Sequence, residues 1–203
     1  MAISCPVCAT PLEMADGRPG CPRCDFWKTS YGSSWWMKHA RNVGQLLAAL
    51  ELRFPWVTWT PGLGALSPNR LDLTPGEKNE ADLTGWMARV PVCMVEVSGT
   101  DSTNVKVPPE PILIRPGKIQ HAAQMAGEVE GHYYFWMVYE ASEKTYLIPI
   151  ATAMRFYRTR MPQVIRGRTE TYCQLPSDSA LPSSALFELV DSRIHEIAER
   201  ISK

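Results

Sequence analysis

The sequence predicts an α/β domain in which strands and helices alternate, preceded by a small metal-binding module. Three observations carry this prediction. Four of the six cysteines lie within the first 24 residues as two CxxC pairs. From residue 34 onward, apolar residues at helical three- and four-residue spacing alternate with short runs rich in β-branched and aromatic residues. A chain of 203 residues has room for one ordinary domain and a small module.

The composition excludes several classes of protein. The chain is 45% hydrophobic and 21% charged, which is typical of a globular protein. Lys and Arg number 21, as do Asp and Glu, so a nucleic-acid surface has to be a local patch rather than a global positive field. The longest apolar run is far shorter than the roughly 18 residues that span a bilayer, and no signal-peptide pattern opens the chain. We therefore expect a cytoplasmic protein of a prokaryotic or viral system, without membrane contact.

The N-terminal module, residues 1–30, has the cysteine spacing of a structural zinc site. Twelve residues separate the two CxxC pairs, and the turn-forming residues 15–20 (ADGRPG) can bring the pairs together. In a reducing compartment, paired CxxC motifs are metal ligands far more often than disulfides, and four thiolates close a tetrahedral Zn2+ site. The segment resembles a zinc ribbon, with contact to nucleic acid and a purely structural role both left open. The expected ligands are Cys5, Cys8, Cys21 and Cys24.

The first half of the domain is expected to contain one long helix and three strands. A helix is predicted over 35–54, because its apolar residues recur at three- and four-residue steps and Pro55 ends the pattern. Residues 56–60 read as a short strand and 61–79 as a Gly- and Pro-rich loop. Two further strands are predicted at 81–88 and 90–97.

Two acids lie on the last two of these strands. Asp82 opens one strand, and Glu96 interrupts an otherwise apolar run, VPVCMVEV, in the next. A carboxylate inside a buried strand is costly to desolvate unless it is paired or bound to a cation, and two such acids close in space are a common way to hold a divalent metal. The alternative is that Asp82 is a turn residue and that Glu96 points to solvent.

The second half begins with a polar loop at 98–111 and a helix predicted at 118–128. The residues HYYFWMVYE (132–140) and TYLIPIA (145–151) then form the best hairpin signal in the chain. Residues 174–184 are interpreted as a linker, and 185–201 as an amphipathic helix that either docks on the domain or makes a dimer contact.

A basic stretch runs from 154 to 168, and no acid interrupts it before Glu170. Phosphate contact is one interpretation, and a solvated or carboxylate-paired face is the other. Its arginines are Arg155, Arg158, Arg160, Arg166 and Arg168. The remaining cysteines and histidines suggest no chemistry of their own. These are Cys93, Cys173, His39, His132 and His195. His121 has two interpretations: it approaches the two acids, or it lies at the surface, as a lone histidine on a helix face more often does.

The order of elements resembles the PD-(D/E)XK nuclease superfamily, and within it the Holliday junction resolvases of archaea and phages. The resemblance covers roughly residues 38–155 and implies a restriction-endonuclease-like mixed β-sheet flanked by helices, in a domain spanning 34–173, with 174–203 as linker and C-terminal helix. It also implies four site positions: the motif aspartate, the second acid, an acid from the first helix, and a polar residue early in the later helix. In that order they are Asp82, Glu96, Glu51 and Gln120.

The chain departs from the family pattern at the lysine that follows the second acid by two residues, because that position holds Ser98. This lysine helps to activate the attacking water and to stabilise charge at the phosphate. Lys118, at the start of the next helix, is the first candidate to replace it, followed by Lys106 and Lys78.

The resemblance implies a metal-dependent DNA endonuclease that hydrolyses phosphodiester bonds, perhaps in branched DNA, and acts as a homodimer. Asp82, Glu96 and the backbone carbonyl of Val97 would hold catalytic Mg2+ or Mn2+. Two other hypotheses remain open at this point. Ser98 favours a catalytically inactive, zinc-ribbon nucleic-acid-binding protein, and the neutral net charge with the C-terminal helix favours a protein-interaction scaffold.

Overall fold

The computed structural model describes residues 13–15, 18–20, 33–62, 65–66, 81–100, 111–139, 144–165 and 168–202. The helices are α1 (Ser33–Arg53), α2 (Pro116–Met125), α3 (Ile150–Arg155) and α4 (Ser184–Ile201), with a short 3-10 helix at Ser177–Ser179. The strands are β1 (Glu13–Ala15), β2 (Arg18–Gly20), β3 (Thr58–Pro61), β4 (Leu83–Met87), β5 (Val90–Thr100), β6 (Ile112–Ile114), β7 (Tyr133–Tyr139), β8 (Lys144–Pro149), β9 (Arg160–Ile165), β10 (Arg168–Leu175) and β11 (Leu181–Pro182).

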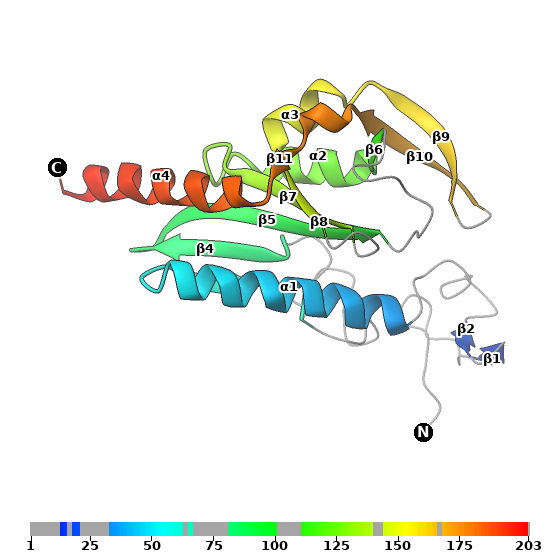
Figure 1. Ribbon diagram of the computed structural model, residues 1–203, viewed down its shortest axis with the longest axis horizontal. Helices are drawn as coiled ribbons and strands as arrows, with labels where there is room; N and C mark the ends of the chain where they lie inside the picture. The colour runs from blue at the N-terminus through cyan, green and yellow to red at the C-terminus, as the bar shows by residue number, and fades with distance from the viewer. Residues whose placement is uncertain are drawn as a thin grey trace.

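The centre of the fold is a six-stranded sheet in the order β11-β8-β7-β5-β4-β3. Neighbouring strands are antiparallel except β5 and β7, which pair in parallel with Glu96 opposite Phe135. A parallel pair needs a long crossover, and here α2 lies between the two strands in the sequence. The mixed sheet flanked by helices confirms the predicted fold class (Figure 1).

Each face of the sheet is covered by a separate apolar cluster. On one face, α1 and α4 pack on the sheet through residues such as Leu50 and Val190. The other face is covered by α2, α3, β6 and β10, and the buried residues of this cluster include Ile119 of α2, Ala153 of α3 and Cys173 of β10. Successive residues of a strand point to opposite faces, so β5 sends Val95 and Val97 to the first cluster and Met94, with Glu96 and Ser98, to the α2 side.

Strands β4 and β5 form a tight hairpin that places both acids. Its two-residue turn, Ala88 and Arg89, has φ values of 48° and 69°, as the right-handed twist of the flanking strands favours. Next to it, a Cβ on Gly85 would lie 2.6 Å from the ring of Trp59 on β3, so a side chain at this position would displace that tryptophan. The register of β3, β4 and β5 is therefore fixed by close packing as well as by hydrogen bonds.

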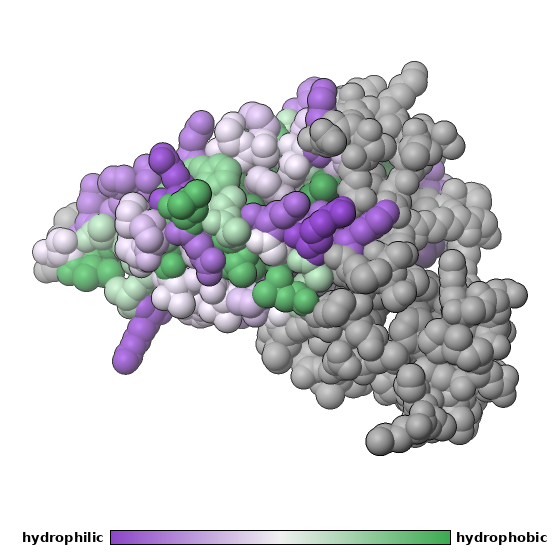
Figure 2. Space-filling model, turned by 60° about the horizontal axis from the view of Figure 1, so that its bottom comes forward, coloured by the Kyte–Doolittle hydropathy of each residue, from purple (hydrophilic) through white to green (hydrophobic). Residues whose placement is uncertain are grey.

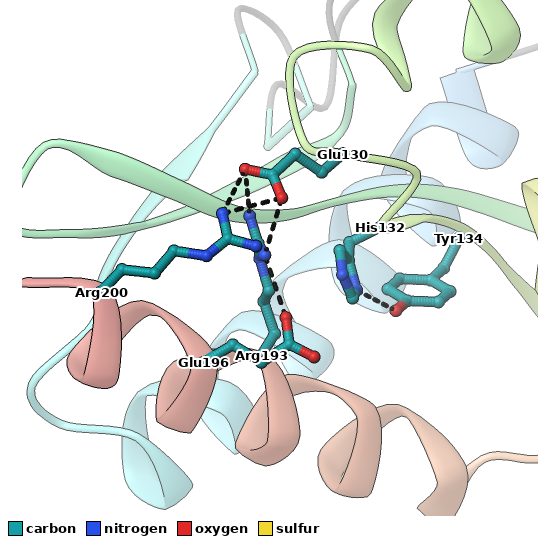
Figure 3. Close-up of polar contacts among 6 residues, drawn as sticks. All are labelled: Glu130, His132, Tyr134, Arg193, Glu196 and Arg200. Carbon is teal, nitrogen blue, oxygen red and sulfur yellow. Dashed lines mark hydrogen bonds and ion pairs between the residues drawn. The ribbon is translucent and has the colours of Figure 1, made fainter.

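Helix α4 is docked on the sheet, which decides between the two interpretations of the C-terminal amphipathic segment. Its apolar side is buried in the same cluster as α1. Arg193, whose side chain is 1% exposed, is held by Glu130 and by Glu196 at 3.0 Å each, and Arg200 reaches Glu130 at 2.8 Å (Figure 3). Because β11 also adds to the sheet through β8, residues from 181 onward pack as part of the same unit.

Exposed apolar groups are scattered over the coloured part of the face shown in Figure 2. They lie in small areas separated by more hydrophilic residues. The large exposed apolar side chains among the described residues are Leu52, Trp56, Leu66, Trp86, Met154, Met161, Leu181 and Ile201. None of the described helices is long and apolar enough to cross a bilayer.

Several elements differ from the sequence-based expectations. The basic stretch, to which the sequence analysis assigned no helix or strand, forms the end of α3 and the outer strand β9, which pairs with β10. Strand β6 lies within no predicted element, and the expected linker contributes β11 and a short 3-10 helix. The four N-terminal cysteines lie outside the described residues, although β1 and β2 form an antiparallel pair in the sequence between the two CxxC motifs.

Candidate active site

Asp82 lies at the junction of three strands. It directly precedes β4, and its carboxylate accepts two hydrogen bonds: the backbone N–H of Val97 donates to Oδ2 at 2.7 Å, and Nε2 of His39 contacts Oδ1 at 3.0 Å. Its backbone carbonyl accepts from Gly62, just after β3, at 3.0 Å. With a side chain only 14% exposed, Asp82 is fixed in one orientation between β5 and α1.

Glu96 projects from β5 on the face covered by α2. Its side chain is 15% exposed, and Oε1 lies 2.6 Å from Nζ of Lys118. Burial raises the pKa of the Glu96 carboxyl, Lys118 opposes this rise, and the charge of Asp82 adds to it. The strand register gives the geometry: Leu83 pairs with Val95, so Asp82 and Glu96 occupy the next positions along the two neighbouring strands.

Lys118 lies in the first turn of α2 and contacts both Glu96 and Ser98. Its Nζ donates to Ser98 Oγ at 2.9 Å, in addition to the ion pair with Glu96. Ser98 holds the position at which the family pattern has lysine, and it shares a strand face with Glu96 because the two are two residues apart. The helix lysine therefore brings its ammonium group to the neighbourhood that a strand lysine would otherwise occupy. Lys106 and Lys78, the other candidates, lie outside the described residues.

His39 joins this group from α1, and the sequence reasoning missed it. A signal for it exists: His39 precedes Val43, Leu46 and Leu50 at helical spacing, so it extends the apolar stripe that packs on the sheet. A polar residue on that stripe needs a buried partner, and Asp82 is that partner.

Two of the predicted site residues do not join the acids. Glu51 is exposed and lies twelve residues beyond His39 on α1, about 18 Å along the helix axis. Gln120 is exposed as well, and its Oε1 accepts from the hydroxyl of Tyr157 at 3.5 Å. Gln120 follows Lys118 by two residues, which turns it to a different side of the helix.

The face of α2 that carries Lys118 provides a second observation. His121 lies one turn after Lys118, and its buried Nε2 has no hydrogen-bond partner within the described part of the chain. The expectation of a simple surface histidine does not fit this half-buried residue.

Three arginines of the basic stretch follow or end α3, which packs beside α2. Arg155, Arg158 and Arg160 are exposed, and the guanidinium of Arg160 lies 4.2 Å from the ring centroid of Tyr157, the partner of Gln120. The side chains of Arg166 and Arg168 lie outside the described part of the structure.

The donor set at the two acids fits a hard divalent cation. Mg2+ is commonly held by one or two carboxylates together with waters, and Asp82 and Glu96 supply two carboxylates that keep unused acceptor capacity beside their present partners. Within the residues that the structure describes, no group of three or more His, Cys, Asp and Glu side chains has the arrangement of a complete metal site. Any ion here would thus complete its shell with backbone oxygen, water or substrate.

The mixed sheet with helices on both faces is a fold that this chain shares with a solved nuclease structure. The chain is similar in structure to D212, a nuclease from a fusselovirus, with a TM-score of 0.50 and 15% sequence identity over 81% of this chain and 96% of that one. It also matches Hjc, a Holliday junction resolvase from the archaeal hyperthermophile Archaeoglobus fulgidus, with a TM-score of 0.44 and 11% identity over 74% of this chain and 98% of that one. No protein-family model and no curated protein sequence matches the chain.

Proposed function

We propose that this protein is a metal-dependent DNA endonuclease that hydrolyses phosphodiester bonds. The observation that carries the proposal is the meeting of three groups beside the start of β4: the carboxylate of Asp82, the carboxylate of Glu96 at the neighbouring position of β5, and the ammonium of Lys118, 2.6 Å from Glu96. A fold shared with a viral nuclease supports the same reading. Branched DNA is the substrate to test first, and a homodimer remains part of this proposal.

Asp82 and Glu96 would hold Mg2+ or Mn2+, with the backbone carbonyl of Val97 as a further oxygen donor. When bound, such an ion lowers the pKa of a coordinated water and offsets charge on the phosphate. His39 and the N–H of Val97 hold the Asp82 carboxylate in a fixed orientation, so the donor atoms need little reorganisation.

Lys118 supplies the positive charge that the family pattern places two residues after the second acid. Its ammonium group lies between Glu96 and Ser98, where it can hydrogen-bond to an attacking water or to a phosphate oxygen. A lysine in this place stabilises the negative charge that develops in the transition state. Ser98 serves as an acceptor that steadies Nζ and has no proton-transfer role of its own.

A cleavage panel tests this proposal. Labelled duplex, single-stranded, flap and four-way-junction DNA would be incubated with Mg2+, with Mn2+ or with EDTA. The parent chain, Asp82→Ala, Glu96→Ala and the control Glu188→Ala, an exposed acid on α4, would be compared. We expect metal-dependent cutting by the parent and the control only. Cutting that survives in both acid variants would contradict the assignment of the site.

A catalytically inactive nucleic-acid-binding protein is the second candidate, favoured by Ser98 at the lysine position. It predicts DNA binding without cutting on any substrate and no effect of Asp82→Ala on affinity. For either candidate function, the N-terminal segment would bind zinc and form a second contact with DNA. Zinc released on thiol modification, measured per chain with a colorimetric chelator and compared with Cys5→Ser, tests that part.

A further inference from the structure

We propose that the β9–β10 ribbon is an arm that holds double-stranded DNA beside the acidic site. Arginines at its base would contact backbone phosphates, and exposed Met161 would lie against the groove. The inference rests on the proposed nuclease function for the identity of the substrate, and it extends that function by naming a duplex flank as part of what the protein recognises.

The ribbon is joined to the rest of the described fold near its root. Strands β9 and β10 pair antiparallel over six residue pairs, from Arg168–Ile165 to Cys173–Arg160. Near its root, β10 pairs with β6, so β9 is the outer strand of this small sheet. Figure 1 shows the ribbon extending away from the six-stranded sheet, on the side of α2 and α3.

The root of the ribbon is tied to the helix that carries Lys118. Arg115, the residue before α2, forms an ion pair with Glu170 of β10 at 2.7 Å. The hydroxyl of Tyr172 donates to the same carboxylate at 2.6 Å. Strand β6 also leads directly into α2. A duplex held by the ribbon would therefore lie in a fixed position relative to Lys118, three residues beyond Arg115.

The charge at the base of the ribbon is uncompensated. Arg155, Arg158 and Arg160 are exposed, and none of them forms an ion pair within the described part of the chain. The nearest acid in the following strand, Glu170, is already neutralised by Arg115. Arg160 is held in place by the ring of Tyr157 and by a hydrogen bond from its Nε to the Tyr157 carbonyl at 3.2 Å. A pre-positioned, unpaired guanidinium is well suited to a phosphate.

The shape favours a duplex over an added protein strand. Pro162 in the outer strand lacks an N–H group, and proline is a common way to block strand addition at a sheet edge. A two-stranded ribbon fits the major groove of B-form DNA. Met161, 51% exposed despite its apolar side chain, offers the kind of contact that DNA-binding proteins make with groove walls. Six residues of strand span about 20 Å, which corresponds to about six base pairs.

Binding measured without divalent metal tests the arm independently of catalysis. Fluorescence anisotropy in EDTA would compare the parent with Arg158→Ala/Arg160→Ala, with the charge-preserving Arg158→Lys/Arg160→Lys, and with the control Arg53→Ala, an exposed arginine at the end of α1. The alanine variant should bind a 20-base-pair duplex about tenfold more weakly, and the slope of log K against log salt should fall by about two. The lysine variant should keep that slope, and the control should match the parent.

The outcomes separate this inference from the nuclease proposal. Equal duplex affinity in the parent and the alanine variant, or an equal loss for single-stranded DNA, would overturn the duplex arm even if the parent cuts DNA. A binding defect confined to duplexes would support the arm even if no substrate is cut. Met161→Glu should weaken duplex binding as well, and unchanged affinity of this variant would remove Met161 from the contact.

Discussion

Replacing Lys118 by methionine is the most informative single perturbation of the candidate site. The change removes the ammonium group that contacts Glu96 at 2.6 Å and Ser98 at 2.9 Å, while it keeps an apolar stem of similar length. Loss of a group that positions the attacking water or assists proton transfer costs about 10²- to 10⁴-fold in rate. We expect kcat to fall by that factor for Lys118→Met, with DNA affinity in EDTA changed much less.

The effect on stability is smaller, because Lys118 is 39% exposed. Breaking a fully buried pair costs about 3–5 kcal/mol, whereas an exposed pair contributes about 0–1 kcal/mol. For this partly screened pair we expect about 1–2 kcal/mol, which corresponds to a decrease in Tm of about 2–8 °C for a chain of this size. The protein should thus remain folded at 25 °C, so a loss of cutting would report on the site.

A relocated lysine provides the control for this reasoning. Ser98 lies on the same strand face as Glu96, so Ser98→Lys in the Lys118→Met background should restore part of the lost rate. Lys144→Met, which removes an exposed lysine at the start of β8, should cut as the parent does. Single-turnover cleavage with Mg2+ measures all four proteins. Cutting by Lys118→Met within threefold of the parent would refute the catalytic role.

Three further predictions concern stability and reactivity. Arg193→Ala deletes two buried methylene groups of the side-chain stem, so we expect a loss of about 1.6 kcal/mol in the free energy of unfolding measured in urea. Arg193→Met keeps most of this buried stem and should lose much less; equal losses would contradict this reasoning. Hydrogen bonds from Arg200 and Arg193 lower the pKa of Glu130 from 4.5 to about 2, so this group contributes stability above pH 4.5 that disappears as the pH falls towards 2. Glu130→Gln should therefore unfold with a weaker pH dependence in this window by circular dichroism, and an unchanged dependence would exclude the ion pair as its source. Burial raises the pKa of the Cys93 thiol to about 12, so this cysteine should resist maleimide at pH 8 until denaturant is added, as mass spectrometry would show; labelling of the native protein would mean that β5 opens readily.

Much of the fold could be predicted from the sequence because its signals are local. The 3.6-residue period of α1 and α4 and the apolar runs of β5 and β7 are consequences of burial on one or both faces, and they are visible along the chain. The sequence-based prediction missed short strands and strands with many polar residues. Strand β9 (RMPQVI) shows no alternation of apolar and polar residues, and tertiary pairing with β10 creates that strand.

For the candidate site, the sequence by itself identified three unusual positions. Two are acids whose burial would be energetically costly, one within an apolar run and one before a strand, and the third is a serine where a lysine was expected. Only the tertiary structure decided which side chains contact them. Lys118 reaches Glu96 because α2 covers the sheet face to which Met94, Glu96 and Ser98 point, and His39 rather than Glu51 meets Asp82 because the N-terminal half of α1 lies over that strand junction. The two pairings join residues that are 22 and 43 positions apart in the sequence, and no local sequence pattern encodes a contact over such a separation.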